Sequence, residues 1–239
     1  MEEEDIKKKR HTPLKEKLKS NIVQLMTKLE LWKEELQREI PTYWDNFGNF
    51  VIFNSRFFVD ENWRKAGPQL WNCVSELFSG KSVALQSKIQ NNEFRSPSAH
   101  VVLGDSPWVK YLDNGVNYTW NVELTMFCTG NVSERHRIGT LDCEGQVIVD
   151  MFAGIGYFSL PYLVHTRAKQ VIACEWNPAS VRALRMNLAE NKVAEKCVVL
   201  EGDVRVVCPR GVADHINLGL IPSCEQYWSV AAEILKPTG

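Results

Sequence analysis

The stretch VIVDMFAGIGYFSL, residues 147–160, decides the fold. Four residues typical of a buried strand end in an acid, Asp150, and a loop follows in which two glycines, Gly154 and Gly156, stand one residue apart. A strand that turns into a helix through such a loop lets backbone amides approach a ligand, and the helix N-terminus favours negative charge. The third glycine of a dinucleotide fingerprint is missing, so the stretch alone predicts either a ligand loop or a plain tight turn.

Strands and helices alternate from residue 144 to the end of the chain. The expected strands are QVIVD, QVIACE, KCVVLEGD and HINLGLIP, and the expected helices are GYFSLPYLVHT, PASVRALRMNLAEN and CEQYWSVAAEIL. Such alternation predicts parallel βαβ units with right-handed crossovers. We therefore expect an α/β, doubly wound Rossmann-like domain over residues 144–239. It has four strands where such a sheet normally has more, so we expect it to be C-terminally incomplete.

A long amphipathic helix is expected within residues 1–40, which carry ten Lys/Arg and nine Asp/Glu. Thr12 and Pro13 suit the helix start, and Pro41 suits its end. Apolar residues recur at steps of three or four: Leu14, Leu18, Ile22, Leu25, Leu29, Trp32, Leu36 and Ile40. This face either packs on the body of the protein or forms a coiled-coil seam for a partner through residues 12–40.

Residues 41–143 have the mixed pattern of a small α+β domain. NFVIFNSRFF is strand-like, and QLWNCVSELF has helical spacing. Two alternating strands flank Asp113-Asn114-Gly115, and Asn-Gly is a strong hairpin signal because it adopts the positive φ angles that the turn needs.

Composition narrows the class of protein. The 28 basic and 29 acidic residues give a formal net charge of -1, so the chain as a whole has no electrostatic attraction to nucleic acid or membrane. Seven scattered cysteines without a C-x-x-C pair, and histidines that do not cluster with them, predict reduced thiols and no metal site. Without an apolar run of membrane-spanning length or a leader, we expect a soluble, cytoplasmic protein with no membrane partner.

Acids at three successive strand ends identify the expected ligand. Asp150 ends the first strand, where a carboxylate repels a pyrophosphate but can pair with an ammonium group. Glu175 ends the second strand and can accept both hydroxyls of a ribose. Asp203 ends the third, within reach of an adenine amino group. A ligand with adenine, ribose, an ammonium group and no phosphate is S-adenosylmethionine.

Three longer segments carry a family resemblance: DMFAGIGYFSLP, ACEWNPASVRALRMNLAEN and NLGLIPS. They resemble the tRNA wybutosine-synthesizing protein 2 family, a neighbour of the tRNA guanine-37 N1-methyltransferases. Tyr157 after the second glycine, Trp176 in CEWNP and Asn217 in NLGLIPS resemble the wybutosine branch. The resemblance extends more loosely upstream to residue 40, and it implies a class I methyltransferase fold for the Rossmann-like domain.

The resemblance implies an enzyme rather than a binding protein. Its members transfer the 3-amino-3-carboxypropyl group of S-adenosylmethionine to C7 of 4-demethylwyosine at position 37 of phenylalanine tRNA, and they release 5′-methylthioadenosine. The middle domain, residues 41–143, is then expected to contact the tRNA. Two alternatives stay open, a guanine-37 N1-methyltransferase and a truncated, non-catalytic binding module.

The resemblance also implies roles for individual residues. The cofactor-binding set is Asp150, Phe152, Gly154, Gly156, Glu175, Trp176 and Asp203. The catalytic set is Asn217, Pro222 and Arg135. Arg135 belongs to Glu134-Arg135-His136-Arg137, which resembles the family's Glu-Arg-x-Arg element and whose arginines can contact phosphate or the target base. An ion-paired surface turn with Glu134 is the competing interpretation.

Overall fold

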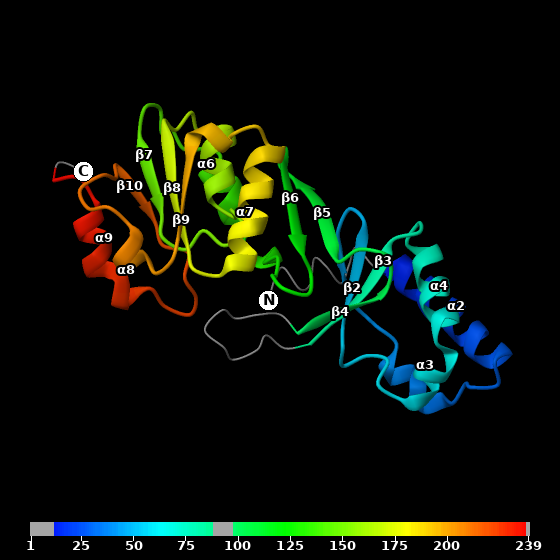
Figure 1. Cartoon of the computed structure of the whole chain (residues 1–239). Coiled ribbons are helices and arrows are strands. Elements are labelled where there is room, and N and C mark those ends of the chain that lie inside the picture. Colours follow the sequence, from blue (N-terminus) through cyan, green and yellow to red (C-terminus); the bar gives the residue numbers. More distant parts are fainter. Residues whose placement is uncertain (1–11, 88–97, 238–239) are drawn as a thin grey trace. The chain divides into compact units, whose positions relative to one another are not determined.

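The computed structural model describes residues 12–87 and 98–237 (Figure 1). The chain divides into two compact units. Unit 1 holds the described residues up to Lys110 together with Val122–Met126, and unit 2 holds Tyr111–Asn121 and the described residues from Phe127 onward. This division differs from the expected boundary at residue 143, because the hairpin and the helix that precede the Rossmann-like sheet pack against helices of that domain.

Unit 1 is built on a four-stranded sheet of order β1-β2-β3-β4. β2 and β3 are parallel, and the other two pairs are antiparallel. The elements are β1 (Asp45–Asn46), β2 (Phe50–Asn54), α3 (Glu61–Ala66), α4 (Pro68–Leu77), β3 (Ser82–Gln86) and β4 (Ala99–Leu103). α3 and α4 form the crossover that a parallel pair requires. The expected strand in NFVIFNSRFF and the expected helix in QLWNCVSELF are confirmed.

The N-terminal helix is shorter than predicted. α2 (Thr12–Lys28) ends where Glu30 adopts a left-handed φ of 60°, and a 3-10 helix, η1 (Glu34–Glu39), follows. The prediction of one helix reaching Ile40 is therefore wrong. Leu18, Ile22 and Met26 are fully buried in one apolar cluster with the sheet and α4. The apolar face of α2 is thus covered inside unit 1, which contradicts the coiled-coil seam.

Unit 2 begins with the expected hairpin. β5 (Trp108–Asp113) and β6 (Val116–Asn121) form a two-stranded sheet, of which the first three residues of β5 belong to unit 1. Asn114 and Gly115 turn the chain with φ angles of 47° and 77°. The next elements are a 3-10 turn, η2 (Thr129–Asn131), and a helix, α5 (Val132–Ile138).

The main sheet of unit 2 is fully parallel, with the order β10-β7-β8-β9. Its strands are β7 (Val147–Asp150), β8 (Gln170–Glu175), β9 (Cys197–Glu201) and β10 (His215–Asn217). Chain order reverses beside β7, which is the switch point where open α/β sheets bind ligands. The predicted doubly wound Rossmann-like fold is confirmed. β10 is shorter than the predicted strand HINLGLIP, whose last five residues form a loop.

Helices cover both faces of this sheet: α6 (Ser159–His165) and α7 (Pro178–Glu190) on one, α8 (Val204–Val207) and α9 (Trp228–Ile234) on the other (Figure 1). Two short 3-10 turns, η3 (Ala194–Lys196) and η4 (Glu225–Tyr227), precede β9 and α9. After α9, Leu235 pairs in parallel with Ala213. None of the helices in the described ranges has the length and apolar character needed to span a membrane.

Candidate cofactor site

Asp150 lies at the carboxyl end of β7, where it connects the neighbouring strand β10 with the helix α6. Its side chain is fully buried and accepts hydrogen bonds from Ser159 Oγ at 2.7 Å and from Asn217 Nδ2 at 3.0 Å. Burial raises the pKa of Asp150 above its ordinary value, because desolvation outweighs the hydrogen bonds that favour the carboxylate. Asp150 thus ties the end of β10 to the start of α6, a structural role that the sequence did not predict.

The glycine loop needs both of its glycines for internal reasons. Gly154 and Gly156 have φ angles of 56° and 98°, where a side chain is strained. A Cβ on Gly154 would lie 2.7 Å from Tyr157 Cε2, and one on Gly156 would lie 2.9 Å from Leu184 Cδ1. The N–H of Gly156 donates to the carbonyl of Ala153 at 2.8 Å, which closes a tight turn.

Glu175, at the end of β8, fastens the glycine loop to the next helix. Its Oε2 accepts from Gly154 N at 2.7 Å, and its Oε1 accepts from Asn177 N at 2.8 Å. Burial raises the pKa of Glu175 in spite of these bonds. A carboxylate has about four acceptor positions, so the Glu175 carboxylate keeps acceptor capacity for a ligand hydroxyl. The side chain of the next residue, Trp176, is 42% exposed.

Asp203 and Phe152 are connected through two residues that the sequence did not single out. Asp203 caps α8 by accepting from Arg205 N at 2.9 Å, and its ion pair with the Arg205 side chain lowers its pKa. The guanidinium of Arg205 lies 5.6 Å from the ring centre of Tyr227. Tyr227 in turn meets Phe152 edge-on at 4.8 Å. Tyr227 was hidden in an ordinary helical pattern, and no signal marked it.

The NLGLIPS segment holds the two other predicted residues apart. Asn217 is half-buried and directed to Asp150, whereas Pro222 is exposed and follows a cis peptide bond. Gly219, between these two residues, packs closely against Phe158: a Cβ added at Gly219 would lie 3.0 Å from the Phe158 ring.

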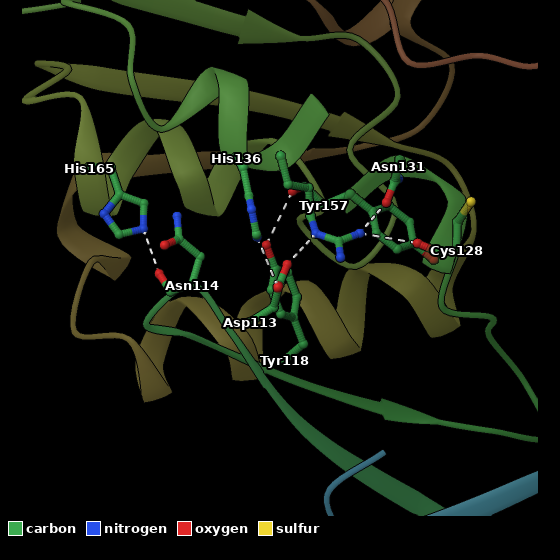
Figure 2. A network of polar contacts seen from close by, with 9 residues as sticks. Asp113, Asn114, Tyr118, Cys128, Asn131, His136, Tyr157 and His165 are labelled. Carbon is green, nitrogen blue, oxygen red and sulfur yellow. Dashed lines mark hydrogen bonds and ion pairs between the residues drawn. The ribbon is translucent and has the colours of Figure 1, made fainter. Parts of the chain in front are cut away.

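Arg135 does not reach the surface, which corrects the expected phosphate or base contact. Its side chain is 1% exposed, and its Nε donates to Asp113 Oδ2 at 2.8 Å. Its Nη1 donates to the Cys128 carbonyl at 3.1 Å and to Asn131 Oδ1. Figure 2 shows Asp113 on one side of this network, and Cys128 and Asn131 on the other. A guanidinium neutralised in this way fixes the hairpin and the η2 turn.

Aromatic rings complete the surroundings of Arg135. Its guanidinium carbon lies 4.8 Å from the ring centre of Phe127 and 5.7 Å from that of Tyr118. By contrast, Arg137 is 57% exposed and makes a two-bond ion pair with Glu134 at 2.8 Å. The predicted surface ion pair with Glu134 is therefore confirmed, with Arg137 as its arginine, but it lies within the helix α5 rather than in a turn. Among the described residues, no group of His, Cys, Asp and Glu could hold a metal ion.

Two family models match the chain. The model of the TRM5/TYW2 methyltransferase domain matches residues 110–239, and that of the TYW2 N-terminal domain matches residues 23–107. The chain is 41% identical over 235 residues to tRNA wybutosine-synthesizing protein 2/3/4 of Arabidopsis thaliana, which covers 98% of this chain and 23% of that protein. It is 43% identical over 212 residues to the tRNA wybutosine-synthesizing protein 2 homolog of Danio rerio, which covers 89% of this chain and 52% of the relative. The chain thus spans about half the length of the latter.

A solved structure with a similar fold is that of TYW2 from P. horikoshii in complex with MeSAdo. The two share 26% sequence identity and a TM-score of 0.73, over 91% of this chain and 76% of the other.

Proposed function

Because the chain belongs to the family of the TRM5/TYW2 methyltransferase domain, we propose that it works in the S-adenosylmethionine-dependent modification of tRNA. The specific reaction that we propose is transfer of the 3-amino-3-carboxypropyl group to C7 of 4-demethylwyosine at position 37 of phenylalanine tRNA. The names of the two relatives described above, both from wybutosine synthesis, support this choice. The observation that carries the proposal is the polar edge of the parallel sheet, where Asp150, Glu175 and Asn217 end three neighbouring strands.

The residues of this edge fit an adenosine sulfonium ligand. Glu175 holds the ribose hydroxyls with its remaining lone pairs, and Trp176 flanks them. Asp203 accepts from the adenine amino group, and Phe152 contacts the purine face. The loop through Gly154 and Gly156 lets the backbone approach the middle of the ligand. The P. horikoshii relative was solved in complex with MeSAdo, which supports a ligand of this class for the chain.

Asp150 acts indirectly in this proposal. It holds Asn217 by Nδ2, so the carbonyl oxygen of that side chain is left to accept from the ligand ammonium group or the target base. Pro222 bounds the mouth of the site from the following loop.

The chemistry that the ligand supplies is an activated carbon next to a sulfonium. Three carbons are activated, so the chain selects the group by placing one of them in line with the nucleophile. In the proposed reaction a bond forms between C7 of the base and the γ-carbon of the methionine chain. The bond from that carbon to sulfur breaks, its electron pair stays on sulfur in 5′-methylthioadenosine, and the C7 proton passes to solvent. Because the sulfonium already activates the carbon, the proposed step requires no metal.

For the RNA, we propose contacts from the middle of the chain, residues 41–143. Within unit 1, the exposed Arg56 lies 4.8 Å from the ring centre of Tyr43 and 5.1 Å from that of Phe57. An exposed arginine beside aromatic rings can stack on unpaired bases. Within unit 2, the exposed Arg137 takes the phosphate contact that the buried Arg135 cannot make. All seven cysteines are free thiols, so we place the reaction in the cytoplasm.

The test follows the carboxyl carbon of labelled S-adenosylmethionine, incubated with the protein and phenylalanine tRNA that carries 4-demethylwyosine. We expect label in the RNA and release of 5′-methylthioadenosine. Release of S-adenosylhomocysteine without label in the RNA would instead favour the guanine-37 N1-methyltransferase. Binding of cofactor or tRNA without turnover would favour a binding module. Arg137→Ala should weaken tRNA use and spare cofactor binding.

A further inference from the structure

Asn187 lies in the middle of α7 and is fully buried, on a helix face otherwise made of small and apolar residues. Its Nδ2 donates to the carbonyl of Ile155 at 2.9 Å, between the two glycines of the loop. Its Oδ1 accepts from the backbone N–H of Thr119 in β6 at 2.7 Å. One side chain therefore joins the glycine loop, α7 and the hairpin.

The bond to Ile155 acts on a peptide unit that is already held at its other end. In the peptide between Ile155 and Gly156, the carbonyl takes the Asn187 bond, and the N–H donates to Ala153. A planar peptide cannot turn one group without the other, so any rotation of this unit breaks both hydrogen bonds. Asn187 thereby restricts the backbone conformation of Ile155. The two glycines on either side of Ile155 are intrinsically the least restricted residues of the loop.

We propose that Asn187 is a positioning residue for the cofactor loop, which it holds in one conformation through the Ile155 carbonyl. The inference rests on the proposed cofactor site, to which it adds a fully buried side-chain amide. Preorganisation of the loop lowers the ordering cost of binding. A single net hydrogen bond corresponds to about a tenfold change in an equilibrium constant.

Asn191 offers a matched control one helical turn further on. It makes the same kind of contact with β6, because its Oδ1 accepts from Asn117 N at 2.9 Å and its Nδ2 donates to Asn117 O at 2.7 Å. The hydrogen bonds of its side chain go to β6 and to its own helix, with none to the glycine loop. Both asparagines support the hairpin, but Asn187 alone of the two also holds the loop.

The experiment compares Asn187→Ser and Asn191→Ser in the full chain. Exchange of the Gly156 amide with solvent, measured by NMR without ligand, should be about tenfold faster in Asn187→Ser and unchanged in Asn191→Ser. Calorimetry should show about tenfold weaker S-adenosylmethionine binding in Asn187→Ser alone. Equal effects in the two variants, or none in Asn187→Ser, would overturn the inference.

Two further results separate the possible failures. If the wild type binds no S-adenosylmethionine, the proposed cofactor fails, and with it the role of Asn187 in that site. If Asn187→Ser does not unfold cooperatively, the variant is not properly folded, and the wild type is used instead. In the NMR spectrum of the wild type, titration with S-adenosylmethionine should shift the side-chain amide signal of Asn187 and leave that of Asn191 unchanged. Equal shifts of the two signals would overturn the inference.

Discussion

At the scale of the residue, the carboxylates of the sheet edge differ in their surroundings and therefore in their titration. Asp150 is fully buried, and its raised pKa reflects desolvation. Asp203 lies nearer the solvent beside Arg205, which lowers its pKa. The two acids hold comparable places in the sequence, each at the end of a strand, but they contribute to stability with opposite signs.

The variant Asp150→Asn tests whether the ionised Asp150 carboxylate lowers the stability of the fold. In the unfolded chain the Asp150 carboxyl titrates near its ordinary value, about 3.9. As the pH rises from there through the higher folded pKa, the unfolded state loses its proton first, and the ionised form is disfavoured in the fold. We expect the free energy of unfolding of the wild type to fall relative to Asp150→Asn across this window. Urea denaturation at a series of pH values measures the difference.

Asp203→Asn is the control with the opposite expected slope. The folded pKa of Asp203 is depressed, so its contribution is present above the unfolded value and is lost as the pH falls through the folded one. The wild type should therefore gain stability relative to Asp203→Asn as the pH rises. A difference between wild type and Asp150→Asn that does not change with pH would contradict the proposed burial of the Asp150 charge.

At the scale of the element, short helices depend on side chains from distant parts of the chain. The N-terminus of α3 is an example, since Glu39 of η1 accepts three hydrogen bonds there with one oxygen. The donors are Val59 N at 2.6 Å, Asp60 N at 2.8 Å and Trp63 Nε1 at 2.8 Å. The hairpin is held likewise, because His165 of α6 donates to the Asn114 carbonyl at 2.9 Å, as Figure 2 shows.

Glu39→Ala should destabilise unit 1 strongly. It leaves three donors without their acceptor, and one of them belongs to Trp63, which is 1% exposed. We expect the free energy of unfolding to fall by about 3 kcal/mol, in the range for unsatisfied buried polar groups. Urea denaturation followed by tryptophan fluorescence measures the loss.

Glu61→Ala is the matched control for Glu39→Ala, because it also removes a carboxylate near the N-terminus of α3. Glu61 is 74% exposed and pairs with Lys65 across one helical turn. Such surface pairs contribute about 0.5 kcal/mol. Similar losses in the two variants would show that Glu39 acts only as a surface charge.

At the scale of the whole molecule, cofactor binding should raise the free energy of unfolding, and the protection that it brings should be concentrated in the loops that contact the cofactor. A ligand that binds the folded state alone stabilises it by about 2.7 kcal/mol at a free concentration 100 times its Kd. We expect S-adenosylmethionine to have this effect in urea denaturation. Hydrogen exchange should show the largest gains in protection at residues 150–159, 175–177 and 202–204.

ATP is the control ligand for this prediction. It shares the adenosine but carries phosphates, which the acidic strand ends repel, so we expect no stabilisation by ATP. Equal stabilisation by the two ligands would identify a nucleotide site instead. Stabilisation by S-adenosylmethionine without protection at these loops would place the cofactor elsewhere.

The sequence alone determined the elements with strong local signals. VIVD, QVIACE and KCVVLEGD became parallel strands, and Asn114-Gly115 became the hairpin turn, because hydrophobic runs and positive-φ residues act over a few neighbours. The Rossmann-like fold followed from the order of these elements. The long N-terminal helix was mispredicted because the apolar spacing continues past Lys28, whereas the helix ends there and Glu30 adopts a left-handed φ.

Only the tertiary structure decided what each polar side chain does. Asp113 is an ordinary turn residue in the sequence, yet it forms a buried ion pair with Arg135, 22 residues away. Asp150 is buried and accepts a hydrogen bond from Ser159, and Asn187 donates one to the glycine loop, 32 residues away in the sequence. The reason is physical: strand and turn formation depend on near neighbours, whereas the burial and partners of a charge depend on segments that meet only after folding.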